Sequence, residues 1–526
     1  MADEVPLTQA IRERLTLMGD PAGALAMLPD PLPSDPHERA HLLQLAVAAC
    51  VSSGDTVGAE RFQAARLAAL RSAGRDAAAE AEARCHDVLL DPAPGAHHLP
   101  QVLSELQRAL AAERPDPELV AGLHVSAVGC SAPGDALELA ESGTTFCRAH
   151  PAELGEFTEF LQLQSVSLLS DLGLGDRAVH LAESAASRAT FRWIRASLWR
   201  LAGLIHGNRL EFSDAAQAFQ EAFEVFAQIG HRAGMVETAE ASATMSRLAG
   251  ATDHACAMLS LALSLGLSPT AERLVTLAEL RTQTGDADAN ATWARALDAQ
   301  QAEGATPEQV AQSRHWQGMA ALRSGESELA EAALRAALTG GTDPVALASG
   351  IQLAEMHLRD DDAEGALVLA DQACALAREL ELPEQASTAL RLRGTARIEL
   401  GDERGMDDLH EAMTVLPNPT PDQRSTLYAS RATGWSRLDV ADRAAADFLS
   451  AAADTTDPLM RAHLERTAAV QLARSGRAVE GEHLLRAAID ELPAGEPHRV
   501  AVLGLIDLLG LLGRTDEAER VRRGLL

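Results

Sequence analysis

Two kinds of segment alternate along the chain. Long Ala- and Leu-rich stretches place apolar residues every three or four positions, and short turns rich in Gly, Asp and Pro separate them. Spacing of this kind is typical of amphipathic helices that bury one face. The pattern returns at intervals of roughly 35 to 41 residues, the range of repeats made of two helices. The sequence therefore predicts a series of antiparallel helix pairs, with no substantial β-sheet.

The turns follow a common rule in which a glycine is followed, five positions later, by a small residue. This offset joins Gly54 to Ala59, Gly250 to Ala255, Gly325 to Ala330, Gly476 to Gly481 and Gly513 to Ala518. Glycine adopts the left-handed backbone conformation that ends a helix without the penalty of a Cβ. A small residue after it lets the second helix pack closely against the first. Turns without glycine are expected near Glu211, Asp361 and Asp439.

One stretch carries a recognisable motif. Trp199, Gly203, Ala215, Phe219 and Ala222 fall at the spacings of the tetratricopeptide repeat. A second unit has Gly318, Gly325, Ala330, Leu334 and Ala337 at matching positions. Three positions depart from the pattern, namely Ala202 in place of Leu, His206 in place of Tyr and Ala227 near the expected Pro.

Over most of residues 160–526 the chain thus resembles the tetratricopeptide-repeat family, in particular its longer-helix bacterial variants. The resemblance implies an all-α fold, a right-handed α-solenoid of stacked antiparallel helix pairs. Before residue 160 the pattern is weaker, because proline-containing stretches interrupt it. We therefore expect a degenerate helical region at 1–110 and the superhelical array at 111–526.

Composition removes several classes of function. Acidic residues outnumber basic ones by 76 to 45, and the net charge of −31 would repel nucleic acids and anionic membranes. The chain has no lysine, so all of its basic side chains apart from histidine are arginines. Phosphate-binding loops of the Walker type, protein kinases and Schiff-base enzymes each require a lysine amine. We expect no nucleic-acid partner, no membrane partner and no cofactor.

The six cysteines are scattered and form no C-x-x-C pair. Such spacing indicates buried thiols in a reducing compartment rather than a disulfide framework. The first residues are acidic and lead into no apolar segment, unlike a secretion signal. The sequence therefore predicts a cytoplasmic protein.

One stretch matches a metalloprotease motif. His37, Glu38 and His41 fit H-E-x-x-H, in which two histidines one helical turn apart hold zinc and the glutamate activates water. Ser34, Asp35 and Pro36 before it instead favour a polar helix start near solvent. We favour this second interpretation and keep a zinc hydrolase as a remote alternative, so that no catalytic or metal residue is assigned.

The local charge is most unusual between Ser184 and Leu210, which contain five arginines and no acidic residue. The predicted partner-binding residues are Arg188, Arg192, Arg195, Trp199 and Arg200. On one continuous helix, the first four of these would share a face. Arginine and aromatic side chains together are typical of protein-binding hot spots. The alternative is that these arginines pair with acidic neighbouring helices and that Phe219, Phe223 and Phe226 fill the core.

We therefore expect a non-enzymatic adaptor or regulatory scaffold whose concave groove binds a protein or peptide through an acidic or carboxylate-bearing segment. The alternative function is a sensor of a peptide or small ligand that changes the shape of the superhelix. Apolar residues near the C-terminus, Leu508, Leu509, Leu511 and Leu512, could support homo-oligomerisation.

Overall fold

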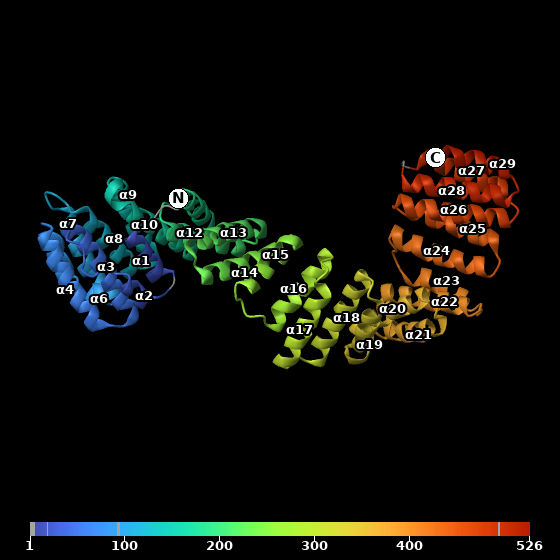
Figure 1. The fold of residues 1–526 in the computed structure, drawn as a ribbon, viewed down its shortest axis with the longest axis horizontal. Helices are drawn as coiled ribbons and strands as arrows, with labels where there is room; N and C mark the ends of the chain where they lie inside the picture. The colour runs from blue at the N-terminus through green and yellow to red at the C-terminus, as the bar shows by residue number, and fades with distance from the viewer. Residues whose placement is uncertain (1–5, 18, 92–94, 493–494, 526) are drawn as a thin grey trace. The chain divides into compact units, whose positions relative to one another are not determined.

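The computed structural model describes residues 6–17, 19–91, 95–492 and 495–525, and these residues form helices and connecting turns with no strand. They divide into two compact units, Met1–Pro269 and Thr270–Leu526, named unit 1 and unit 2 below. Figure 1 shows the helices of each unit in chain order. The predicted all-α architecture of stacked antiparallel helix pairs is confirmed within each unit.

Unit 1 begins with shorter helices and continues with long antiparallel pairs. Its helices are α1 (Leu7–Thr16), α2 (Pro21–Ala26), α3 (Pro36–Ser53), α4 (Thr56–Ser72), α5 (Asp76–Arg84), α6 (His86–Leu90), a 3-10 helix (Ala96–His98), α7 (Leu99–Leu110), α8 (Pro117–Cys130), α9 (Pro133–Arg148), α10 (Pro151–Asp171), α11 (Gly175–Ala186), α12 (Arg192–Asn208), α13 (Phe212–Ile229), α14 (Arg232–Leu248) and α15 (Thr252–Ser264).

Unit 2 is a regular series of pairs. Its helices are α16 (Ala271–Thr284), α17 (Ala289–Glu303), α18 (Pro307–Ser324), α19 (Ser327–Gly340), α20 (Asp343–Arg359), α21 (Ala363–Glu379), α22 (Pro383–Glu399), α23 (Gly405–Val415), α24 (Pro421–Arg437), α25 (Ala441–Asp454), α26 (Pro458–Arg474), α27 (Ala478–Glu491), α28 (Glu496–Leu511) and α29 (Thr515–Leu525).

Local sequence explains where the helices begin. Many first helices of a pair start at a proline, whose fixed φ suits the first helical position and whose missing N–H is not needed there. Thr306 before α18 and Thr420 before α24 each form a reciprocal capping box with a glutamine three residues later.

Left-handed residues end the first helix of most pairs, as the sequence predicted. The five glycines of the turn rule all have positive φ, between 72° and 85°. At the turns without glycine, Leu210, Asp361 and Asp439 adopt the same conformation. At the α10–α11 turn the left-handed residue is Gly173.

The motif glycines allow the two helices of a pair to touch. A Cβ at Gly203 of α12 would lie 3.0 Å from the ring of Phe219 on α13, and one at Gly318 of α18 would lie 2.6 Å from Leu334 on α19. Any larger residue at these positions would push the helices apart. The motif positions therefore make the contacts that a helix-pair repeat requires.

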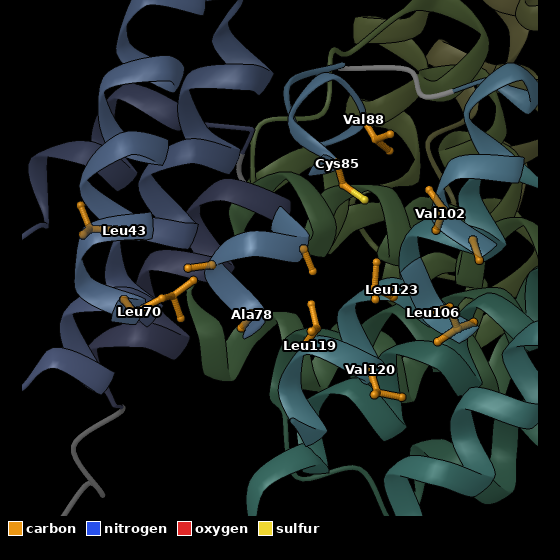
Figure 2. Close-up of a cluster of buried hydrophobic side chains, with 14 of the residues drawn as sticks. Leu43, Leu70, Ala78, Cys85, Val88, Val102, Leu106, Leu119, Val120 and Leu123 are labelled. Carbon is orange, nitrogen blue, oxygen red and sulfur yellow. The ribbon is translucent and has the colours of Figure 1, made fainter. Parts of the chain in front are cut away.

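Buried apolar clusters hold each unit together, and the clusters recorded among the described residues each lie within one unit. Figure 2 shows the cluster near the start of unit 1, where Cys85 of the α5–α6 turn, Val102 of α7, and Leu119 and Leu123 of α8 point toward a shared interior. All six cysteines are buried and free, as the sequence predicted. The boundary expected at residue 110 lies between α7 and α8, inside unit 1, and stays a prediction about repeat character.

Candidate partner-binding surface of unit 1

The start of α12 determines which of the five predicted residues share a face. Glu159 of α10 accepts hydrogen bonds from the backbone N–H groups of Thr190, at 2.7 Å, and Phe191, at 3.1 Å. This carboxylate binds the residues just ahead of α12, so that the helix begins at Arg192. Arg188 lies in the turn after α11 and is exposed. The expectation that Arg188 continues the face of one helix is therefore wrong.

The other four residues do lie on α12. Arg192, Arg195, Trp199 and Arg200 are each partly buried. Arg200 pairs with Glu237 of α14 at 2.9 Å. Arg195 makes no hydrogen bond or ion pair with the residues that the structure describes, and its Nε is buried without an acceptor. Within the described ranges, one cation on this face thus has no counter-charge.

The chain's own first helix contacts this face. Arg192 Nη2 donates to Glu13 Oε2 of α1 at 3.1 Å, across 179 residues of sequence, and the Glu13 side chain is only 6% exposed. Leu17, at the end of α1, packs beside Trp199 on the buried residues of α12 and α13. The backbone of Leu17 also hydrogen-bonds to His231, before α14. We call Arg192, Arg195, Trp199 and Arg200 with these α1 contacts the α12 surface.

A second side of α1 is fixed independently. Ile11 packs with Ala24 of α2 and Leu42 of α3, and all three are at most 1% exposed. Arg12 Nε lies 2.6 Å from Glu156 Oε1 of α10. Alpha1 is therefore held by an apolar contact to its sequence neighbours and by charged contacts to α10 and α12.

The structure supports the intramolecular interpretation of the Arg- and Phe-rich stretch in part, and the partner-binding interpretation stays a prediction. Phe219 and Phe226 are 3% exposed and belong to the core, and Phe223 is partly buried. Arg192, Arg200 and Arg209 have acidic partners in neighbouring segments, whereas Arg195 has none recorded. The pairing with α1 escaped sequence reasoning, because no local pattern links Glu13 to Arg192.

A cavity of about 260 Å³ lies between α1 and the helices that follow it. Arg12 and Thr16 of α1 form part of its wall, and Phe157, Phe160 and Trp193 contribute aromatic rings. Arg66 and Glu82, 2.8 Å apart, and the bonded pair Arg75 and Glu118 also line it. The first half of unit 1 thus has a concave interior with apolar and charged walls.

The electrostatics of this interior are tightly balanced. Burial opposes ionisation of Glu118, but His41, at 3.8 Å, and Arg75 outweigh it and lower the pKa of Glu118 to about 2. Burial raises the pKa of the Cys85 thiol, which also lines the cavity, to about 11. Glu118 is therefore ionised at neutral pH, and Cys85 is a protonated, unreactive thiol.

The H-E-x-x-H residues lie at the start of α3. His37 and Glu38 are exposed, and Asp35 caps the helix by accepting from the Glu38 backbone N–H at 3.0 Å. Within the described ranges, potential metal ligands gather in two groups, Asp91 with His97 and His98, and His206 with Glu211 and Asp214. Neither group includes His37 or His41, so the geometry favours the polar helix start.

His206 is explained by ion pairing. Its Nδ1 lies 2.7 Å from Glu211 and its Nε2 lies 3.1 Å from Glu183, so both ring nitrogens face carboxylates. Burial disfavours the charged ring, but the two carboxylates outweigh it and raise the pKa of His206. Arg209 also binds Glu211. These contacts favour the protonated form of the His206 ring.

Unit 2 has hollows of its own. A cleft of about 540 Å³ is lined by the first helices of successive pairs, α18, α20, α22 and α24. Its walls mix apolar side chains such as Met319 and Ile351 with polar ones such as Gln352, Ser387 and Thr426. Arg391 in this cleft already pairs with Glu355 at 2.8 Å. The cleft therefore lacks the unpaired cation that distinguishes the α12 surface.

No described helix is both long enough and apolar enough to span a bilayer. The expectation of no membrane partner otherwise stays a prediction.

Comparison with known proteins supplies structural neighbours. No protein-family model and no curated protein matches the sequence. The chain is similar to the apo form of the quorum sensor NprR from B. thuringiensis, with 12% identity, coverage of 62% of this chain and 97% of that one, and a TM-score of 0.40.

Two other solved structures are also similar. For yeast Tom70 the identity is 13%, the coverage 81% and 93%, and the TM-score 0.32. For the APC/C hetero-tetramer Cut9-Hcn1 these values are 14%, 94% and 99%, and 0.37. Likenesses at this level concern the arrangement of helices alone.

The repeat character rests on this chain's own packing. Gly203 meets Phe219 and Gly318 meets Leu334 at the motif positions, and left-handed turns join the paired helices. The chain is a tetratricopeptide-like helical-repeat protein.

Proposed function

We propose that unit 1 is a non-enzymatic binding module and that its α12 surface holds an acidic, amphipathic segment of a protein partner. The observation that carries this proposal is the packing of α1 against α12. Glu13 of α1 pairs with Arg192, and Leu17 packs with Trp199 on the same buried residues of α12 and α13. Arg195 next to it has no recorded acidic partner. A partner with one more carboxylate than α1 would satisfy Arg195 as well, through a forked charge-assisted hydrogen bond.

In this proposal α1 is an internal competitor for the partner's site. A tethered segment reaches effective concentrations on the order of millimolar. An external segment must therefore bind the surface more tightly than α1 does in order to displace it. The protein therefore acts as a cytoplasmic adaptor whose binding surface is covered until a stronger acidic segment displaces α1. Its buried free thiols support a reducing compartment.

The test uses a fluorescent peptide with the sequence of residues 6–20, titrated into the full chain and followed by anisotropy. The Glu13→Gln, Leu17→Asp variant weakens the tethered α1, and we expect it to bind the peptide about tenfold more tightly than the wild type. Adding Arg192→Glu and Arg195→Glu should abolish binding, because the cation that pairs with Glu13 of the peptide and its neighbouring cation both become anions.

The control is Arg71→Glu with Arg148→Glu, which makes the same change of charge at two exposed positions of unit 1. Peptide binding should survive in this control and weaken at high salt. The amount of partner captured from native cytosol should differ between the variants in the same order as the peptide affinity. If the variant with Arg192→Glu and Arg195→Glu binds the peptide as tightly as the control variant does, the α12 surface is not the site.

A sensor is the second candidate function. Alpha1 contributes at once to the α12 surface, through Glu13, and to the wall of the cavity, through Arg12 and Thr16. A ligand in the cavity that contacts α1 would change how firmly α1 covers α12. Ligand-dependent change in peptide binding would favour the sensor, and unchanged peptide binding would favour the simple adaptor.

Self-association is a separate proposal about the C-terminal end of unit 2. Leu508 and Leu509 are fully buried, whereas Leu511 and Leu512 are 67% and 39% exposed. Only the second pair can therefore contribute to an interface between copies of the chain.

A further inference from the structure

The cavity of unit 1 has the size of a small aromatic molecule. A cavity of about 150 Å³ suffices for benzene, and this one measures about 260 Å³. In proportion it accommodates about ten non-hydrogen atoms. Phe157, Phe160 and Trp193 line it together with aliphatic side chains such as Val102 and Leu119. Walls of this kind suit a flat, mostly apolar ligand.

The charges that line the cavity are already matched with each other. Its three arginines, Arg12, Arg66 and Arg75, face Glu156, Glu82 and Glu118 respectively. A charged ligand would have to leave water without meeting a free counter-charge, which is costly. The cavity therefore favours a neutral ligand.

The unsatisfied polar atoms of the described lining residues do not face the cavity. Trp193 Nε1 and Gln44 Oε1 are buried without a partner, and neither has surface that a molecule in the cavity could reach. The aromatic and aliphatic walls therefore provide the binding contacts.

We propose that this cavity binds a neutral, flat, mainly aromatic molecule of about ten non-hydrogen atoms. This binding concerns residues other than Arg192 and Arg195. It therefore stands whether or not the α12 surface binds a protein.

Three probes test the proposal: naphthalene and 2-naphthol, which are neutral, and benzoate, which is charged and no larger than naphthalene. Equilibrium dialysis against the full chain measures each. We expect 2-naphthol to bind with one equivalent and a Kd on the order of 100 µM. Naphthalene should bind with similar affinity, and benzoate should not bind.

Gly122 offers a way to fill the cavity without disturbing the fold. It lines the cavity from α8, and a Cβ added there meets no atom within 4 Å. Gly122→Leu should therefore fold and lose binding of 2-naphthol. Gly129→Leu is the matched control, since Gly129 lies on the same helix, is also free of contacts at Cβ and does not line the cavity.

Absence of 2-naphthol binding, or binding that Gly122→Leu leaves intact, would overturn the proposed site. Equal affinity for all three probes would overturn the assigned ligand class, and a cavity occupied by ordered water alone would give the first of these results.

Discussion

His206 replaces the tyrosine that the repeat pattern usually has at its position, and the replacement changes the chemistry of that turn. A tyrosine would donate one hydrogen bond, whereas His206 faces carboxylates of Glu183 and Glu211 with both ring nitrogens. Only the protonated imidazole can donate to both at once. The α12–α13 pair therefore depends on the protonated form of this side chain, which the two carboxylates favour.

The pH dependence of stability follows from the raised pKa of His206. The stabilisation is fully present below the unfolded value near 6.5 and is lost as the pH rises through the higher folded value. The melting temperature of the wild type should therefore exceed that of His206→Gln by more at pH 6 than at pH 8. We expect this difference to change by about 2 °C, measured by circular dichroism.

His37→Gln is the control, because His37 is exposed and should show no such trend. A difference in melting temperature between wild type and His206→Gln that stays constant from pH 6 to pH 8 would mean that the ring is not cationic in the folded protein.

At the scale of single residues, the sequence identified side chains that carry unusual chemistry but not their partners. Arg192, Arg195 and Trp199 stood out because a basic, aromatic stretch is rare in an acidic chain. Glu13 did not stand out, since one glutamate on a short amphipathic helix is ordinary. Its role depends on a contact across 179 residues, and no local pattern encodes that contact.

Glycine sets the spacing of whole helices in α22 and α23. A Cβ at Gly394 would lie 2.7 Å from the carbonyl oxygen of Gly405, and one at Gly405 would lie still closer to the oxygen of Gly394. The atoms in contact here belong to the backbones of the two helices, so a side-chain movement cannot relieve a clash between them. This pair of helices depends on two glycines that face each other.

Gly394→Ala should therefore destabilise unit 2 by about 1–3 kcal/mol, because the methyl group overpacks the contact. Gly510→Ala, on α28 with no atom near its Cβ, should stabilise the chain slightly, by up to about 1 kcal/mol. Chemical denaturation of the full chain would measure both effects. A stabilising Gly394→Ala would show that the two helices can separate freely.

Among the elements, helix pairs and their turns were readily predicted, whereas one break was not. Glycine and apolar spacing are local signals, and the structure reproduces them at Gly54, Gly325 and Gly513. The break between α11 and α12 carries no glycine or proline, because Glu159 of α10 stabilises it. A break stabilised by a distant carboxylate is invisible to a local pattern.

At the scale of the whole molecule, the division at Pro269 has a testable consequence. The buried clusters recorded for the described residues each belong to one unit, and repeat arrays are stabilised mainly by contacts between neighbours. Fragments 1–269 and 270–526 should therefore each fold when expressed alone, and their helical circular dichroism should sum to that of the intact chain.

Fragment 1–269 should also retain the wild-type affinity for the peptide of residues 6–20, since the α12 surface lies within it. If either fragment is unfolded while the intact chain is folded, the units depend on each other.

The position of α1 imposes an order on biosynthesis. Glu13 precedes its partner Arg192 by 179 residues, so at about 5–20 residues per second a ribosome adds the second roughly 10–35 s after the first. During that interval Ile11 can already pack with Ala24 and Leu42, which emerge soon after it. Glu13 cannot pair with Arg192, and Leu17 cannot pack on α12 and α13, until these helices have been made. Docking of α1 onto α12 thus follows the synthesis of most of unit 1, and in the nascent chain Glu13 and Leu17 are open to other proteins before their own chain covers them.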